Sequence, residues 1–315
     1  MLQLHPRVAR PHVVGDVKLS ETVLDLTLYL ARPTDVELDW LVDYYEQVCS
    51  RARFRFYAIP ELTDWDPVDD PDLTKSGRAA AQAGVRRPYL EPVRNRVRSQ
   101  REFHLQIWDG MEQGSTHFNI GGVDVDDPPG SASFVRMCFP LDTDPEALVD
   151  IAEELADSVD FISGHGGLAL LYDAWNKYDS FTHHYALARR WWGLDLEDLN
   201  VTLPWMNTSI KGAQWLTLVG HQFVHDFALE PEFGRFSSGV TVQSKNKGVV
   251  IRAGQEPLEG DQHAVAPGLD AYEEVALALQ RCTVDPPEEF TGDGFMANAN
   301  TQGWFHRFFD PTGWR

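Results

Sequence analysis

A stretch of strict alternation near the start of the chain constrains the fold most. Between residues 23 and 30 a leucine stands at every second position, and the residues between them are Val23, Asp25, Thr27 and Tyr29. Successive side chains of a β-strand point to opposite faces, so this stretch predicts a strand with one leucine-covered face against a core.

Two amphipathic helices with defined starts are predicted around further strands. Thr34 and Glu37 have the spacing of a capping box, which predicts a helix over 34–48. Asp144 followed by Pro145 predicts the start of a second helix, which runs to about residue 160. Alternating or apolar runs between the two helices predict strands at 53–57, 103–108, 117–125 and 134–139.

Strands that arrive in runs, with helices between the runs, predict an α+β fold. We expect mixed or antiparallel sheets with helices packed on one face, built as two related α+β halves. These halves are residues 1–130 and 131–315, or they form one continuous domain. The 10 Trp, 17 Phe and 9 Tyr of the 315 residues supply a large core without disulfides or metals.

The net charge of −21 is distributed unevenly along the chain. Residues 1–101 carry 15 basic and 15 acidic side chains, whereas residues 102–315 carry 12 basic and 33 acidic ones. Such a surface repels nucleic acid and acidic membranes and attracts cationic partners. Six arginines between residues 86 and 101 have one aromatic neighbour, Tyr89, so they predict a solvated helix face or a local counter-charge for the acidic half rather than a nucleic-acid site.

The cellular location is predicted from the cysteines and the N-terminus. Cys49, Cys138 and Cys282 are isolated in apolar surroundings, as expected for buried free thiols in a reducing compartment. The first sixteen residues have two prolines and several polar residues where a secretory signal needs an apolar run. No run approaches the roughly 20 apolar residues that span a bilayer. We therefore expect a cytoplasmic protein.

Two short motifs suggest enzymes, and each lacks a required partner. The run Ser163–Gly167 contains His-Gly-Gly, as oxyanion loops of lipases do, but no G-x-S-x-G nucleophile motif exists in the chain. We interpret this run as a glycine-rich turn that leads into a strand over 168–172.

His221 and His225 have the spacing of zinc-hydrolase ligands, but Gln222 replaces the glutamate that acts as the base. A metal-dependent hydrolase that uses these two histidines remains the alternative. With no phosphate-binding loop either, we predict no catalytic, cofactor-binding or metal-binding residues.

Four features in order resemble the type VI secretion immunity family. They are an apolar strand that follows glycines, G-L-D, I-K-G-A-Q-W-L-T-L-V-G, and A-G-x-x-P-x-x-G-D, at residues 161–170, 193–196, 210–220 and 253–261. The resemblance implies a cytoplasmic antitoxin that inactivates a secreted toxin by direct binding. From the residues alone, the same motifs are interpreted as scaffold: glycines for tight backbone turns, and Trp215, Leu216 and Leu218 as core.

The leading hypothesis is therefore an immunity protein and not an enzyme, which neutralises a toxin by covering its active site. A basic nuclease would suit the acidic surface, and nucleic acid and membranes are not expected as partners. Acidic residues on predicted loops are the candidate contacts: Asp126, Asp127, Glu288 and Glu289. A structural component of a secretion or phage-like assembly is a third possibility.

Overall fold

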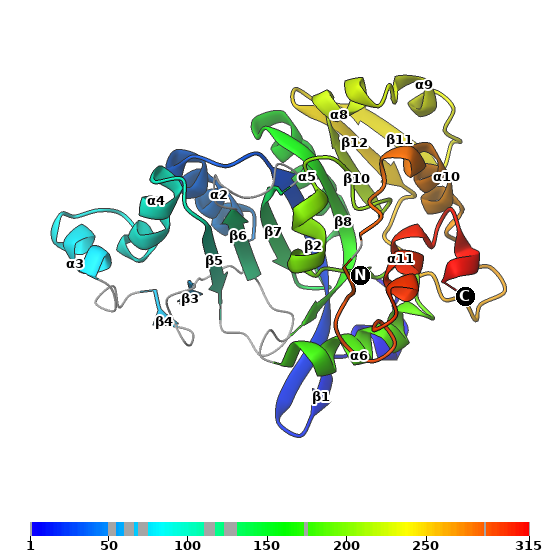
Figure 1. Ribbon diagram of the computed structural model, residues 1–315, viewed down its shortest axis with the longest axis horizontal. Coiled ribbons are helices and arrows are strands. Elements are labelled where there is room, and N and C mark those ends of the chain that lie inside the picture. Colours follow the sequence, from blue (N-terminus) through cyan, green and yellow to red (C-terminus); the bar gives the residue numbers. More distant parts are fainter. Residues whose placement is uncertain are drawn as a thin grey trace.

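The computed structural model describes residues 2–49, 55–59, 66–68, 75–109, 117–122, 131–172, 176–286 and 288–314. Its described strands form one twelve-stranded sheet, which runs across Figure 1 from β4 to β11. The order is β11 (Val240–Ser244), β12 (Gly248–Ala253), β10 (Leu216–Gly220), β8 (Phe161–Tyr172), β2 (Val17–Leu30), β7 (Ser133–Phe139), β6 (His117–Gly122), β5 (Phe103–Trp108), β3 (Phe56–Ala58) and β4 (Asp66–Pro67).

Two short strands lie off this path. β1 (His12–Val14) makes an antiparallel hairpin with β2, and β9 (Asp195–Leu196) pairs in parallel with β8. Every other pairing between described strands is antiparallel. The helices are α1 (Pro6–Ala9), α2 (Asp35–Val48), α3 (Lys75–Gln82), α4 (Glu91–Arg98), α5 (Pro145–Ser158), α6 (Lys177–Ala188), α7 (Leu199–Thr202), α8 (His221–Asp226), α9 (Glu230–Phe233), α10 (Asp270–Leu279) and α11 (Asn298–His306). The predicted α+β class is confirmed.

The leucine alternation produces an apolar sheet face. Leu24, Leu26 and Leu28 of β2 pair with Phe139, Met137 and Val135 of β7, so these six side chains share one side of the sheet. Helix α2 packs on this side, and its Tyr45 hydroxyl donates a hydrogen bond to the Cys138 carbonyl. Helix α5 contacts β8, β10 and β12, where Arg252 of β12 pairs with Glu146 of α5.

Both predicted helix starts are confirmed by their capping bonds. The Thr34 hydroxyl accepts from the Glu37 amide at 3.2 Å, while the Glu37 carboxylate accepts from the Thr34 amide at 2.7 Å. At α5 the Asp144 carboxylate accepts from the Glu146 amide at 3.1 Å. These bonds satisfy amides that the first helical turn leaves without partners.

The arginine-rich stretch supplies counter-charges to helix α2. Arg86 and Arg87 pair with Asp43, Arg94 pairs with Asp39 at 2.6 Å, and Arg98 pairs with Asp35 at 2.7 Å. These acids belong to the N-terminal region, whereas the prediction was a counter-charge for the acidic residues of 102–315, so that prediction is wrong in its partner. These pairs fasten α4 and the segment before it against α2.

The sheet joins both parts of the sequence. Strand β2 lies between β7 and β8, so the longest strand of the first 130 residues pairs with two strands from the rest of the chain. The division into 1–130 and 131–315 stays a prediction.

All three cysteines are buried and free, as expected, and burial raises the pKa of the Cys138 thiol to about 12. Among the described helices, none combines the length and the hydrophobicity that crossing a bilayer requires.

Candidate functional site

The four acidic candidates divide into a pair that the structure describes and a pair that it does not. Asp126 and Asp127 lie outside the described residues. Glu288 and Glu289 are exposed, and the Glu288 carboxylate accepts a hydrogen bond from the Trp205 indole N–H at 3.0 Å. The structure thus shows accessible carboxylates at 288 and 289, and their role as contacts stays a prediction.

The two histidines with zinc-ligand spacing lie at the surface on helix α8. The His221 ring nitrogen Nε2 is 2.9 Å from the Lys245 carbonyl oxygen, and the His225 side chain is 85 % exposed beside Asp226. Neither histidine belongs to the described residues whose ligand atoms group closely enough to hold a metal ion. Nothing in this geometry favours the hydrolase alternative.

The predicted glycine turn at Ser163–Gly167 is wrong, because these residues continue strand β8. Gly164 and Gly166 lie on the apolar side, where a Cβ atom would come within 2.6 Å of Leu28 Cδ2 and within 3.0 Å of Leu26 Cδ1. The glycines therefore make room for the leucines of β2. His165, between them, faces the opposite side of the sheet, beside Thr27 on β2 and Thr217 on β10.

On this opposite side, His165 belongs to a buried group of charged side chains that we call the charged cluster. Its members are at most 5 % exposed and come from β2, β7, β8, the β9 region and the segment before β10: Asp25, Arg136, His165, Asp195, Glu197 and Lys211. They form two linked parts. Arg136 Nε lies 2.7 Å from Asp25 Oδ2, and Lys211 Nζ lies 2.7 Å from both Asp195 Oδ2 and Glu197 Oε2.

Neutral side chains complete the hydrogen bonding of the two carboxylates that hold Lys211. Gln214 donates to Asp195 Oδ1 at 2.9 Å. The Tyr29 hydroxyl donates to Glu197 Oε2 at 3.0 Å, and the Thr202 hydroxyl donates to Glu197 Oε1 at 2.6 Å. Buried charges are tolerated only when they are paired and hydrogen-bonded, which is the arrangement found here.

The electrostatics of the cluster favour a charged histidine. Burial and the Lys211 ammonium lower the pKa of His165, but Asp195 at 3.1 Å and Glu197 at 3.4 Å hold it above its ordinary value. Although burial would raise the pKa values of Asp195 and Glu197, Lys211 and His165 keep both below the usual range. With His165 protonated, three cations balance three carboxylates, and the cluster is neutral.

A metal ion is not needed for this balance. Asp25, His165 and Asp195 offer ligand atoms within 4.8 Å of one another. The Lys211 ammonium already lies between Asp195 and the His165 ring, 3.5 Å from His165 Nε2, and Arg136 neutralises Asp25. The side chains of the cluster are at most 5 % exposed. We assign the cluster a structural role: its ion pairs join β2 to β7, and the β9 region to the segment before β10.

Three family motifs supply three of the six residues of this cluster and one of its hydrogen-bond partners. His165 comes from the glycine-flanked strand, Asp195 from G-L-D, and Lys211 with Gln214 from I-K-G-x-x-W. The interpretation of these motifs as scaffold did not identify the polar residues as one group. A signal was present, since a charged residue among apolar neighbours in a predicted core requires a partner of opposite charge.

Comparison with known proteins identifies the family of the chain. Residues 81–308 match the family described as type VI immunity for VRR-NUC. The chain belongs to this family. The predicted resemblance to type VI secretion immunity proteins is thereby confirmed, and the matched span contains five of the six residues of the charged cluster.

The fold of this family member also resembles a solved structure. The Pseudomonas aeruginosa T6SS protein PA0821 superposes with a TM-score of 0.72 at 18 % sequence identity, over 96 % of this chain and 88 % of that protein. At this level of identity, the likeness concerns the fold alone. The sequence matches no curated protein.

Replacing His165 with glutamine should change how the stability of this family member depends on pH. The folded-state pKa of His165 is raised, so its contribution is complete below the unfolded value of about 6.5 and is lost as the pH rises through the folded value. The difference in unfolding free energy between wild type and His165→Gln should therefore be largest near about pH 6 and should shrink above it. Urea unfolding across this range measures the difference.

The exposed His225 provides the control. His225→Gln should leave the pH profile parallel to that of the wild type, because this side chain is 85 % exposed. A His165→Gln difference that grows as the pH rises through about 6.5 would show that His165 is neutral in the folded protein, and a difference that stays constant would show an unshifted pKa. Either result would contradict a protonated His165 in the cluster.

Proposed function

We propose that this chain is an immunity protein that binds a VRR-NUC nuclease toxin and neutralises it by covering its active site. Membership of the type VI immunity family for VRR-NUC carries the proposal. On this proposal the chain acts by binding and catalyses no reaction, and it acts in the cytoplasm, where the substrate of a nuclease toxin lies.

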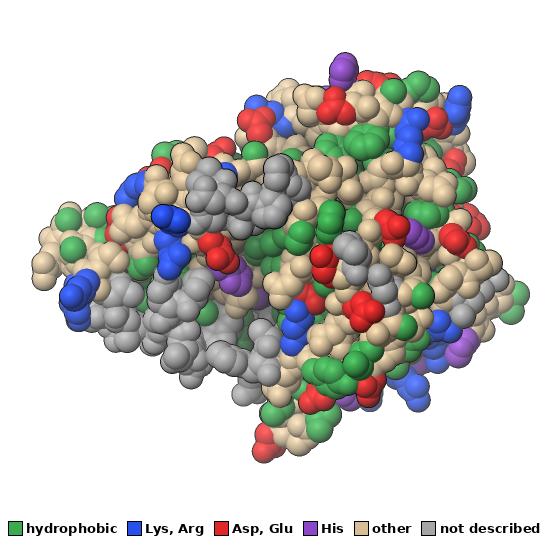
Figure 2. All heavy atoms as spheres, in the orientation of Figure 1, with side chains coloured by type: hydrophobic (Ala, Val, Ile, Leu, Met, Phe, Trp, Pro, Cys, Tyr) green, Lys and Arg blue, Asp and Glu red, His purple; other side chains and the backbone are tan. Residues whose placement is uncertain are grey.

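The charge of the chain supports a nuclease partner. A nuclease needs a cationic surface to hold the phosphates of its substrate. This chain carries −21, all of it in residues 102–315, and acidic side chains are scattered over the C-terminal part of the face in Figure 2. Opposite potentials speed association and favour the correct partner over neutral ones.

The described residues that follow the 123–130 stretch contact the same segment as Glu288, which supports one docking surface. Residues 131 and 132 follow the 123–130 stretch, and the Ala132 amide donates to the Leu203 carbonyl at 3.0 Å, while Asn207 donates to the Ser131 carbonyl. Glu288 accepts from Trp205 of the same short segment. Chain positions shortly after Asp127 thus lie against the segment that also contacts Glu288.

Co-expression tests the function itself. We expect a VRR-NUC protein to be encoded beside this chain and to be toxic to Escherichia coli alone, and co-expression of this chain should restore growth and yield a co-purifying complex. Toxicity that persists with this chain present, together with no complex, would overturn the proposal.

Reversing the charge of Glu288 and Glu289 should weaken binding of this nuclease. Glu288→Lys with Glu289→Lys places two cations on the proposed surface, and we expect at least about a tenfold slower association at low salt, with a smaller effect at high salt. Surface plasmon resonance at several salt concentrations measures the rates. The matched control reverses Glu230 and Glu232 on α9, at the top of Figure 1. Equal slowing by both double variants would show that only the total charge matters.

A further inference from the structure

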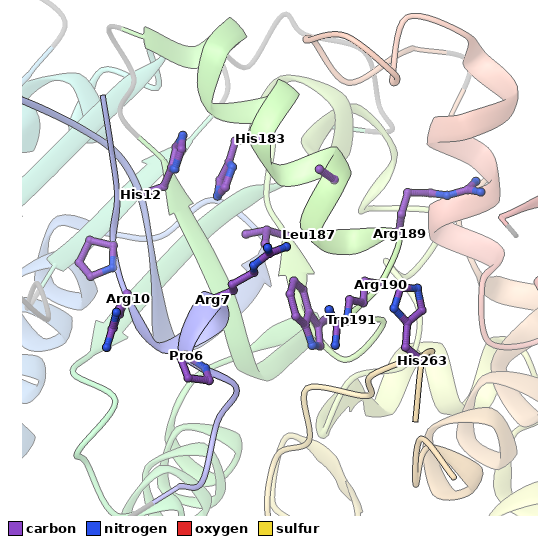
Figure 3. A pocket seen from close by; sticks show the side chains of 12 residues that line it. Pro6, Arg7, Arg10, His12, His183, Leu187, Arg189, Arg190, Trp191 and His263 are labelled. Carbon is purple, nitrogen blue, oxygen red and sulfur yellow. The ribbon is translucent and has the colours of Figure 1, made fainter. Parts of the chain in front are cut away.

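A cavity of about 840 Å³ lies between helices α1 and α6 (Figure 3), and none of its lining residues belongs to the charged cluster. Four arginines line it: Arg7 and Arg10 from the N-terminal segment, and Arg189 and Arg190 after the end of α6. None of the described residues that line the cavity is acidic. Such a concentration of cations is unexpected in a chain that carries 48 acidic and 27 basic residues.

Three of these arginines have no carboxylate partner among the residues that the structure describes. Arg190 is paired in bidentate fashion with Asp261, at 2.8 and 2.7 Å. Arg7 and Arg10 are exposed and make no ion pair with any described residue. Arg189 stacks on Trp314 at 5.4 Å and, in Figure 3, points away from Arg7. The arginines beside helix α2, in contrast, are neutralised by carboxylates.

A buried donor in the wall of the cavity also lacks an acceptor. Trp191 lines the cavity and is 2 % exposed, yet its indole N–H has no hydrogen-bond acceptor among the described residues. An unsatisfied buried donor costs roughly 1–3 kcal/mol. An oxygen-rich anion in the cavity would provide acceptors for the guanidinium groups, and a shift of the Trp191 ring would bring its indole N–H to the same anion.

His183 in the wall adds a hydrogen-bond donor without adding charge. His12 and His183 stack with ring centroids 3.5 Å apart and 6° between their planes, as Figure 3 shows. Burial, and secondarily the proximity of His12, lower the pKa of His183 to about 4, so this ring is neutral at pH 7. The positive charge of the cavity therefore comes from the arginines.

We propose that this cavity binds a small organic phosphate of about nucleotide size. Guanidinium groups match phosphate oxygens in a planar, bidentate geometry, and unpaired arginines are free to use it. The volume lies within the roughly 300–1,000 Å³ of small-molecule sites, which exceeds what inorganic phosphate fills. Leu187, Pro6 and Trp191 supply the apolar wall that an organic group would contact. This site does not depend on binding of a toxin.

Calorimetric titration of the purified full chain with ADP, adenosine, inorganic phosphate and citrate tests the proposal. We expect ADP to bind with a Kd below about 1 mM and adenosine not to bind. Arg7→Gln with Arg10→Gln should weaken ADP binding at least about tenfold, because it removes two charge-assisted donors. Both side chains are exposed, so the variant should fold as the wild type does, which circular dichroism checks.

The control variant is Arg235→Gln, which removes a guanidinium that is 71 % exposed on the segment after α9. It should bind ADP as the wild type does. Absence of ADP binding, equal binding of adenosine, or ADP binding unchanged in the double variant would each overturn the proposal. Binding of inorganic phosphate or citrate as tight as that of ADP would also overturn it, since a small-anion site would then suffice.

Discussion

Replacing Lys211 with methionine should destabilise the folded protein by about 3–5 kcal/mol, the typical cost of removing one partner from a buried ion pair. Methionine keeps most of the side-chain volume but leaves Asp195 and Glu197 without their shared ammonium, from which each carboxylate is 2.7 Å away. The cluster then has three carboxylates and, with His165 protonated, two cations. Urea unfolding monitored by tryptophan fluorescence measures the free energy of unfolding.

Two further variants separate the loss of charge balance from other effects. Lys211→Met combined with Asp195→Asn makes the cluster neutral again, so part of the lost stability should return. Lys245→Met breaks a pair with Glu153 in which both side chains are about one-fifth exposed, and it should cost less than about 1 kcal/mol. A loss below about 1 kcal/mol for Lys211→Met itself would contradict the assignment of the cluster to stability.

Local patterns were sufficient for part of the fold. The leucines of 23–30 indicated β2 and its apolar face, because alternation is a property of a single strand. The Thr34–Glu37 and Asp144–Pro145 starts were found because a cap involves neighbours along the chain. The arginines between 86 and 98 could not be paired with specific partners from sequence, since their acids precede them by about 40 to 60 residues and meet them only through packing of α2.

The charged cluster shows where sequence reasoning ends. Its members span positions 25 to 211. The register of the strands brings together those on β2, β7 and β8: Thr27 lies opposite both His165 and Arg136 because β2 separates β7 from β8. The glycines of 163–167 suggested a turn, whereas their function is to let the Leu26 and Leu28 side chains approach the β8 backbone. The same residue type serves both purposes, and only the neighbouring strand distinguishes them.

Two of the family motifs contact each other directly, next to the charged cluster. The Gly193 amide donates to the Glu259 carbonyl at 2.9 Å, and Trp191 forms a bridge with Asp261. This pairing brings G-L-D against A-G-x-x-P-x-x-G-D. Backbone approach is so close that a Cβ atom on Gly193 would lie 1.8 Å from the Leu258 carbonyl oxygen. The glycine of the first motif is therefore required by the position of the second.

Replacing Gly193 with alanine should accordingly destabilise the protein by more than about 3 kcal/mol. The added Cβ atom would clash with backbone atoms of Leu258 and Glu259, so no side chain can move to relieve the clash. Asp195 lies two residues after Gly193, so separation of the two segments would also displace Asp195 from Lys211. Thermal and urea unfolding measure the loss. Gly239→Ala is the matched control, since the nearest atom to its added Cβ is 3.6 Å away, and it should change stability by less than about 1 kcal/mol. A Gly193→Ala protein as stable as this control would show that the two motifs can separate without loss, and that the charged cluster is held by the sheet alone.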